Sequence, residues 1–268
     1  MIAFSTLPIE GSEGYRKIPF LQSLGVENIE ITWSIGLSLD NRKDFSKISN
    51  EILSTGIKIV SSHAPLWTAR GKEVDLSSSD DWDRKFAVRE VQKSIFAFNM
   101  LTGGTGGNTV IHCGRKFLSA SRKNHLERAA ESLGEILDFI ENENFKIDLC
   151  LENTLPGEVG CCLCDLLYIK EKLKSGRIKF CLDTGHYNIA EKEPQTLSEM
   201  SGNIAEVHLH DNSGEKDEHL PPGEGAINWK ELFAKIHEYK RLFVFELLDA
   251  GGEAVKKCLD FSKEFLDG

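Results

Sequence analysis

Short apolar runs alternate with longer stretches of helical periodicity along the 268 residues of the chain. The runs are rich in Val, Ile and Leu, which is typical of parallel strands that are buried on both faces. They cover residues 2–5, 28–32, 58–63, 109–112, 147–153, 178–183, 204–210 and 242–247. The clearest helices are expected over 80–101, 121–143 and 228–239, the first with Asp80 or Asp81 as its N-cap.

This alternation of eight strands with helices predicts an α/β protein made of one (β/α)₈ barrel domain over residues 1–268. An open, doubly wound sheet is the alternative. The glycine-rich run at 103–107 precedes the fourth strand, so in a barrel it would lie at the N-terminal face, away from the chemistry. It lacks the Gly-Lys-Ser/Thr sequel of a phosphate-binding loop, and we interpret it as a helix C-cap and turn.

Composition narrows the class of protein. No stretch approaches the roughly 20 apolar residues that cross a membrane, and no basic signal segment begins the chain. Seven scattered cysteines, several inside apolar runs, are typical of reduced thiols, so we expect a soluble cytoplasmic protein. The cluster Cys161, Cys162 and Cys164 is a weak metal candidate, because such zinc sites usually have two separated pairs.

The net charge of −10 disfavours a nucleic-acid partner without excluding one, since bound metal ions would reverse the local field.

Side chains with metal-binding chemistry stand at or near the ends of six successive predicted strands. In a (β/α)₈ barrel these ends meet at one mouth, where active sites lie. Histidine and acidic side chains rarely belong in buried strands unless they are paired or bind metal. The strand-end residues are His63, His112, Glu152, Asp183, His208 and Glu246, and two following loops add His186, Asp217 and His219.

Each of these residues also has a purely structural interpretation. A single histidine such as His63 is often a satisfied core residue, Glu152 or Glu246 can pair with a basic side chain, and Asp183 can cap a turn. Nine such coincidences at one rim are less plausible than a site for one to three divalent ions. Imidazole and carboxylate together suit Zn²⁺ or Mn²⁺.

Three other histidines are expected outside this centre. His210 should alternate to the other face of its strand, where it would have a structural or supporting role. His125 and His237 fall within predicted helices and are expected on the surface.

Several motifs resemble those of the xylose-isomerase-like TIM-barrel superfamily. They are SSHAP at 61–65, VIHCG at 110–114, LENT at 151–154, LDTGH at 182–186, HLHDN at 208–212, DEHLPPGEG at 217–225 and VFEL at 244–247. The superfamily contains sugar isomerases and epimerases, inosose dehydratases and the endonuclease IV family of abasic-site nucleases. The resemblance therefore implies a TIM-barrel enzyme that depends on a divalent metal.

The resemblance implies one of two ligand sets. The endonuclease IV pattern implies three zinc ions, the first on His63, His112 and Glu152, the second on Glu152, Asp183, His208 and Glu246, and the third on His186, Asp217 and His219. The epimerase pattern implies a single ion on Glu152, Asp183, His208 and Glu246. In that pattern His186 would contact the substrate.

Three features depart from these patterns. The first strand reads IAFSTLP, without the histidine-containing motif of endonuclease IV relatives. Leu66 stands where those relatives have an aromatic residue, although Trp67 is adjacent. No arginine lies between Asp211 and Gly225, where epimerases carry one that grips the substrate. This loop is more similar to that of a broad group of sugar-phosphate isomerase/epimerase-like proteins.

Two mechanisms fit the ligand sets, and we predict the first, that of a sugar or sugar-phosphate isomerase or epimerase. In this chemistry, one ion would polarise a sugar carbonyl, while Glu152 and Glu246 exchange protons with opposite faces of the substrate carbon. The alternative is phosphodiester hydrolysis of abasic DNA, in which three ions would bind the phosphate and activate water. A non-catalytic sugar binder is a third interpretation, but a binding module has no need of two metal-bound glutamates.

The first mechanism defines the expected substrate, a small sugar or sugar phosphate. Trp33 and Trp67 follow the second and third strands and would form the floor of its pocket. Glu30, near the end of the second strand, would bind a substrate hydroxyl or support a histidine. The sequence is also compatible with a homo-oligomer.

Overall fold

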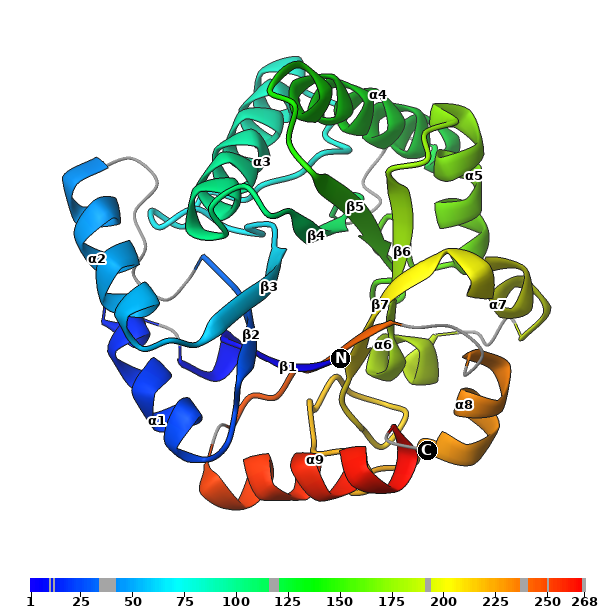
Figure 1. Cartoon of the computed structure of the whole chain (residues 1–268). Helices are drawn as coiled ribbons and strands as arrows, with labels where there is room; N and C mark the ends of the chain where they lie inside the picture. The colour runs from blue at the N-terminus through cyan, green and yellow to red at the C-terminus, as the bar shows by residue number, and fades with distance from the viewer. Residues whose placement is uncertain are drawn as a thin grey trace.

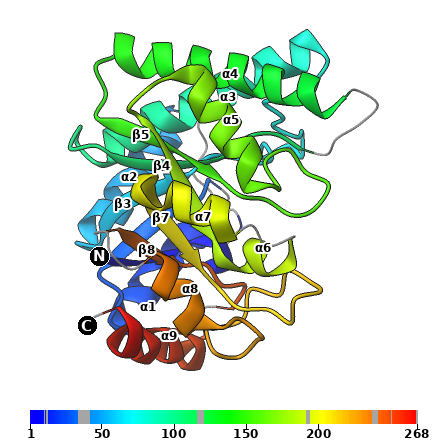
Figure 2. The ribbon, with the colours of Figure 1, turned by 90° about the vertical axis from the view of Figure 1, so that its right-hand side faces the viewer.

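The computed structural model describes residues 1–9, 11, 13–33, 42–115, 121–190, 194–236, 241–249 and 251–266. Within these residues, eight parallel strands pair in chain order, and β8 pairs with β1 to close the sheet (Figure 1). Helices surround the closed sheet on its outside (Figures 1 and 2). The predicted (β/α)₈ barrel is therefore confirmed, and the open doubly wound sheet is wrong.

The elements lie close to their predicted positions. The strands are β1 (Ile2–Ser5), β2 (Asn28–Ile31), β3 (Lys58–His63), β4 (Gly107–His112), β5 (Ile147–Glu152), β6 (Ile178–Asp183), β7 (Ile204–Leu209) and β8 (Leu242–Phe245). The helices are α1 (Ile18–Ser23), α2 (Arg42–Ser54), α3 (Asp81–Leu101), α4 (Arg122–Asn142), α5 (Leu163–Leu173), α6 (Thr184–Ile189), α7 (Pro194–Met200), α8 (Trp229–Ile236) and α9 (Gly252–Phe265). Short 3₁₀ turns are η1 (Leu7–Ile9), η2 (Gly14–Lys17) and η3 (Ser201–Asn203).

Helix α3 illustrates why the predicted helices form. The Asp80 side chain accepts hydrogen bonds of 2.9 Å from the backbone N–H groups two and three residues further on, which confirms it as the N-cap. Val91, Ile95 and Phe98 recur at helical spacing and are buried. None of the described helices has the length and low charge needed to cross a membrane.

The glycine-rich run lies at the N-terminal end of β4, as predicted, and connects it to α3. A Cβ atom on Gly106 would lie 2.1 Å from the carbonyl oxygen of Lys146, so only glycine fits this turn. Helix α8 covers Trp229–Ile236, and the rest of the helix predicted to 239, with His237, lies outside the described residues.

The side chains inside the barrel change from apolar to ionisable toward the C-terminal end. Val110, Cys150 and Cys181, on neighbouring strands, form one buried cluster. Because side chains alternate along a strand, the residues two positions further on share this inward face. Those residues are predicted metal ligands, so the sheet itself places the candidate site directly beyond this buried cluster.

Candidate metal centre

Strand register brings the predicted ligands together at the C-terminal mouth. His112 on β4 lies directly beside Glu152 on β5, and Asp183 on β6 lies beside His208 on β7. The side chains of Glu152, Asp183 and His208 are at most 1% exposed. Glu246 follows the last residue of β8 and is also buried. The convergence that the sequence predicted is thus found in the structure.

Three of these residues form a group that we call the strand-end triad, made of His63, His112 and Glu152. The Oε2 atom of Glu152 lies 3.1 Å from Nε2 of His63 and 3.0 Å from Nε2 of His112. All three candidate ligand atoms lie within 4.8 Å of one another. The three side chains come from the adjacent strands β3, β4 and β5.

A second set, the central group, consists of Glu152, Asp183, His208 and Glu246. The Nδ1 atom of His208 lies 3.0 Å from Oε1 of Glu152, 3.4 Å from Oε2 of Glu246 and 3.9 Å from Oδ2 of Asp183. Glu152 therefore faces the strand-end triad with one carboxylate oxygen and the central group with the other.

The third set, the loop triad, consists of His186, Asp217 and His219. Its histidines approach one oxygen of Asp217, with Nε2 of His186 at 3.3 Å and Nε2 of His219 at 3.1 Å. His186 lies in the first turn of α6, whereas Asp217 and His219 belong to the loop between β7 and α8. His219 has a φ of 48°, which non-glycine residues rarely adopt.

Backbone carbonyl groups fix the tautomers of three of these histidines. Nδ1 of His63 donates to the carbonyl oxygen of Ala64 at 2.8 Å, and Nδ1 of His186 donates to that of Asn153 at 2.9 Å. Nδ1 of His219 donates in the same way to the carbonyl oxygen of Glu246, also at 2.9 Å. When the histidine is neutral, the lone pair is therefore on Nε2, which faces a carboxylate. Metal-binding histidines typically have this arrangement, so the residues present fit divalent ions.

The same proximity shifts the protonation of the metal-free side chains. Burial lowers the pKa of His63, but the hydrogen bond and charge of Glu152 outweigh it and raise the pKa to about 9. Burial also opposes protonation of His186 and His219, yet the neighbouring carboxylates raise their pKa to about 10 and about 9. The pKa of Asp217 is lowered, because its two histidine partners outweigh its burial. A metal ion must therefore displace protons from these histidines.

A cavity of about 850 Å³ opens over the three sets of ligands. Seven predicted ligands line this cavity, namely His63, His112, Glu152, His186, Asp217, His219 and Glu246. Most of the other lining residues are apolar, and they include both Trp33 and Trp67. Trp67 is half exposed, and the guanidinium of Arg115 lies 5.4 Å from its ring centre.

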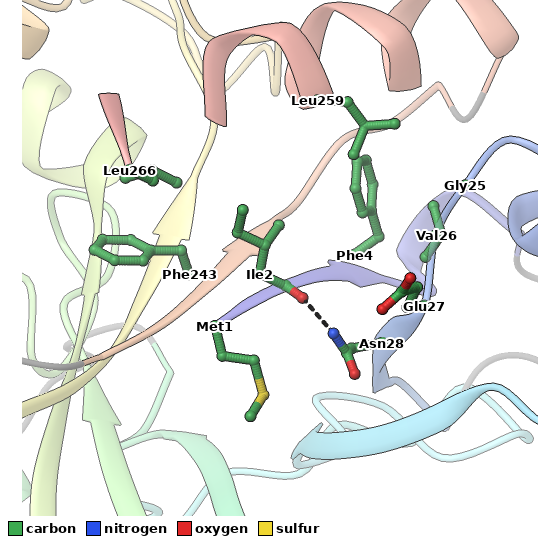
Figure 3. Close-up of a pocket in the computed structure, with 10 residues that line it drawn as sticks. All are labelled: Met1, Ile2, Phe4, Gly25, Val26, Glu27, Asn28, Phe243, Leu259 and Leu266. Carbon is green, nitrogen blue, oxygen red and sulfur yellow. Dashed lines mark hydrogen bonds between the residues drawn. The ribbon is translucent and has the colours of Figure 1, made fainter. Parts of the chain in front are cut away.

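A smaller cavity of about 370 Å³ lies at the N-terminal end of the barrel (Figure 3). Ile2, Phe4 and Phe243 line it, with Leu259 of α9, and its polar side chains include Asn28, which donates to the carbonyl oxygen of Ile2 at 2.8 Å. No described residue lining it is a histidine, cysteine or aspartate. The chemistry of the described residues is therefore concentrated at the opposite end.

Comparison with known proteins agrees with the barrel fold. Residues 18–265 match the model of the family described as "Xylose isomerase-like TIM barrel". The chain belongs to this family.

The relatives of this xylose isomerase-like barrel include both a probable endonuclease and a sugar epimerase. A probable endonuclease 4 of Mycoplasmopsis pulmonis (strain UAB CTIP) is 30% identical over 56% of this chain and 55% of its own length. Fructoselysine 3-epimerase of Escherichia coli O157:H7 is 31% identical over 41% of this chain and 40% of its own length. The crystal structure of a D-tagatose 3-epimerase-like protein superposes with a TM-score of 0.81 at 24% identity, covering 99% of this chain and 97% of that one, which describes the fold. The chain spans about half the length of the first curated relatives it matches.

Two residues around the centre of this xylose isomerase-like barrel are placed differently from their expected positions. Glu30 is fully buried and is not among the residues that line the pocket. Its Oε2 lies 3.3 Å from Nε2 of His208, a position that favours the supporting role over a contact with a substrate hydroxyl. His210 does not alternate away from the centre, because β7 ends at Leu209. Its Nε2 lies 2.9 Å from both carboxylate oxygens of Asp183, and its ring stacks on that of His219 at 4.0 Å.

His125 is not on the surface of α4, as expected, but is 2% exposed. Its Nδ1 lies 3.1 Å from the carbonyl oxygen of Ser77, because the inner face of α4 covers the segment that follows β3. The cysteine cluster is nearer the surface, with Cys161 and Cys162 partly buried and Cys164 exposed.

Sequence reasoning also missed residues that line or support the site. Glu206 lies two positions before His208 on β7, so strand alternation was a usable signal for an inward side chain. Burial, followed by the charge of Glu30, raises the pKa of Glu206 to about 8. Arg115 and Glu158 line the cavity from loops and carried no comparable periodic signal.

Proposed function

We propose that the protein is a metal-dependent phosphodiesterase with three divalent ions in its active centre and a phosphodiester of a sugar as its substrate. The observation that carries this proposal is the fixed tautomer of His63, His186 and His219, each of which presents Nε2 to a carboxylate. These histidines belong to the strand-end and loop triads, outside the central group. A single ion in the central group would leave the two histidines of the strand-end triad, and Asp217 and His219 of the loop triad, without a metal to bind.

Charge balance supports a phosphate substrate. The three sets of ligands contain four carboxylates, those of Glu152, Asp183, Asp217 and Glu246. Three divalent ions would exceed this negative charge by two positive charges. The buried ions would then dominate the local field, so the net charge of −10 does not oppose an anionic substrate. The cavity of about 850 Å³ is large enough for a sugar phosphate.

Bound ions would polarise the phosphoryl oxygens and lower the pKa of the attacking water. The protein's own contribution is positioning. Glu152 directs one oxygen to His208 and the other to His63 and His112, so one carboxylate connects two sets of ligands. Trp33 and Trp67, which line the cavity, would cover the sugar and exclude water from the organic part of the substrate.

Metal content and hydrolysis measured on one sample test the proposal. Protein purified without chelator should carry three zinc ions per chain by elemental mass spectrometry. It should hydrolyse bis(p-nitrophenyl) phosphate, lose this activity to a chelator and regain it with zinc. His63→Ala should lose one ion, whereas Glu253→Gln, an exposed carboxylate on α9, should keep all three. One ion per chain with no hydrolysis would overturn the proposal, and cleavage of an abasic duplex in the same assay would extend the substrate to DNA.

A single-ion sugar epimerase is the second candidate. It is supported by Glu152 and Glu246, which both line the cavity and approach Nδ1 of His208 at 3.0 and 3.4 Å. In this alternative the two glutamates would exchange protons with opposite faces of the substrate carbon. One manganese ion per chain, with uptake of solvent deuterium next to the carbonyl of a ketose and no phosphoester hydrolysis, would favour it.

A further inference from the structure

Asp211 anchors the loop that carries Asp217 and His219. It lies two residues after the end of β7 and its exposed fraction is 0%. Its backbone N–H donates to the carbonyl oxygen of Leu220 at 2.8 Å, and the N–H of Leu220 donates back to that of Asp211 at 2.9 Å. This pairing closes the part of the loop that contains both loop-triad residues.

The carboxylate of Asp211 accepts hydrogen bonds from four positions along the following segment. Oδ1 accepts from the backbone N–H of Asn212 at 2.9 Å and of Ile227 at 3.1 Å. Oδ2 accepts from the backbone N–H of Gly223 at 2.9 Å and from the indole Nε1 of Trp229 at 3.0 Å. A single buried side chain therefore holds the beginning, the middle and the end of the loop.

The segment is shaped to fit around this carboxylate. A Cβ atom on Gly225 would lie 2.2 Å from Oδ1 of Asp211, so glycine permits the approach. Asn212 adds a connection to α6, because its Nδ2 donates to the carbonyl oxygen of Gly185 at 3.0 Å, beside His186. The anchor thus fixes the loop relative to all three loop-triad residues.

We infer that Asp211 is the positioning residue that sets the number of metal ions the centre binds, because it holds Asp217 and His219 in place for the third. The inference rests on the proposed three-ion function. His219 occupies an unfavourable backbone region, which persists only when the surrounding structure constrains it. Without the anchor, each binding event would have to order this loop, and the third ion would bind more weakly.

Asp211→Asn tests the inference, because an amide offers one acceptor oxygen to four donors. In a zinc titration, the variant should bind two ions with the parent affinity and the third about 10- to 100-fold more weakly. Amide hydrogen exchange of the metal-free variant should be faster between residues 212 and 227. Asp217→Asn is the matched control, since it removes a ligand from the same loop. It should lose the third ion while the backbone N–H groups of Gly223 and Ile227, which bond to Asp211, stay as protected in the metal-free protein as in the parent.

Trp229→Phe keeps the test decisive if Asp211→Asn does not fold, because it removes one of the four hydrogen bonds and retains an aromatic ring. It should weaken the binding of the third ion and leave the binding of the other two unchanged. A parent chain that binds three ions and an Asp211→Asn variant that does so with unchanged affinity would overturn the role of Asp211 only. A parent chain that binds one ion would instead contradict the three-ion proposal before any variant is made.

Discussion

The strand-end triad and the loop triad have the same donors, two histidines and one carboxylate, but different support. His63, His112 and Glu152 stand on neighbouring strands whose register fixes their spacing. Asp217 and His219 stand on a loop that the carboxylate of Asp211 holds in place. The carboxylates of the two triads also differ in exposure, since the side chain of Glu152 is 1% exposed and that of Asp217 is 22% exposed.

Two sites with the same ligand chemistry can therefore differ in how firmly they are held. A closed sheet cannot shift one strand end without breaking its ladder, so the strand-end triad should be preorganised. The loop can open without unfolding the barrel, because its hydrogen bonds are local and partly exposed. We expect the strand-end ion to bind more tightly and the loop ion to respond more strongly to changes nearby.

Glu152→Gln should have the largest effect, because Glu152 belongs to both the strand-end triad and the central group. Hydrolysis of bis(p-nitrophenyl) phosphate should fall by about 10³-fold or more, since several kcal/mol of transition-state stabilisation depend on these ions. The metal content of the same sample should fall by two ions. Asp217→Asn should lose one ion and retain more activity, so equal losses in the two variants would contradict the comparison.

Sequence predicted the strand-end triad better than the surroundings of the loop triad for a physical reason. Val110 and His112, or Cys150 and Glu152, follow the alternation of a buried strand, so their side chains could be placed without knowing tertiary contacts. The role of Asp211 depends on hydrogen-bond donors that lie as far along the chain as Trp229. No periodic pattern in the sequence indicates that these donors contact Asp211. The burial of His125 likewise depends on the segment that α4 covers.

Rising pH should increase the affinity of the loop triad for its ion more steeply than that of the strand-end triad. In the metal-free protein the pKa of His186 is raised to about 10 and that of His219 to about 9, so both are protonated at neutral pH and both protons must leave. Apparent affinity should then rise by about 100-fold per pH unit below their pKa values. At the strand-end triad, His63 releases one such proton, which gives about tenfold.

Zinc titrations against a competing chelator, run at neutral pH and about one pH unit higher, measure both slopes. His219→Ala removes one of the two protons and should reduce the slope of any remaining third-ion binding. The same substitution at His63 should leave the loop slope unchanged. If zinc affinity rises equally steeply with pH at both triads, the predicted difference between the two sites is wrong.

Glu30→Gln should have the smallest effect, and it tests the sheet-supported side of the comparison. Glu30 lies 3.3 Å from Nε2 of His208 and both side chains are fully buried, so the substitution keeps the shape but removes the charge that orients the imidazole. Affinity for the ion of the central group should fall by about 10- to 100-fold, because outer partners of metal-bound histidines have effects of this size. Glu206→Gln is the matched control, since a carboxyl group with its pKa raised to about 8 is already neutral at pH 7. If both variants bind the central ion as the parent does, strand register alone positions His208.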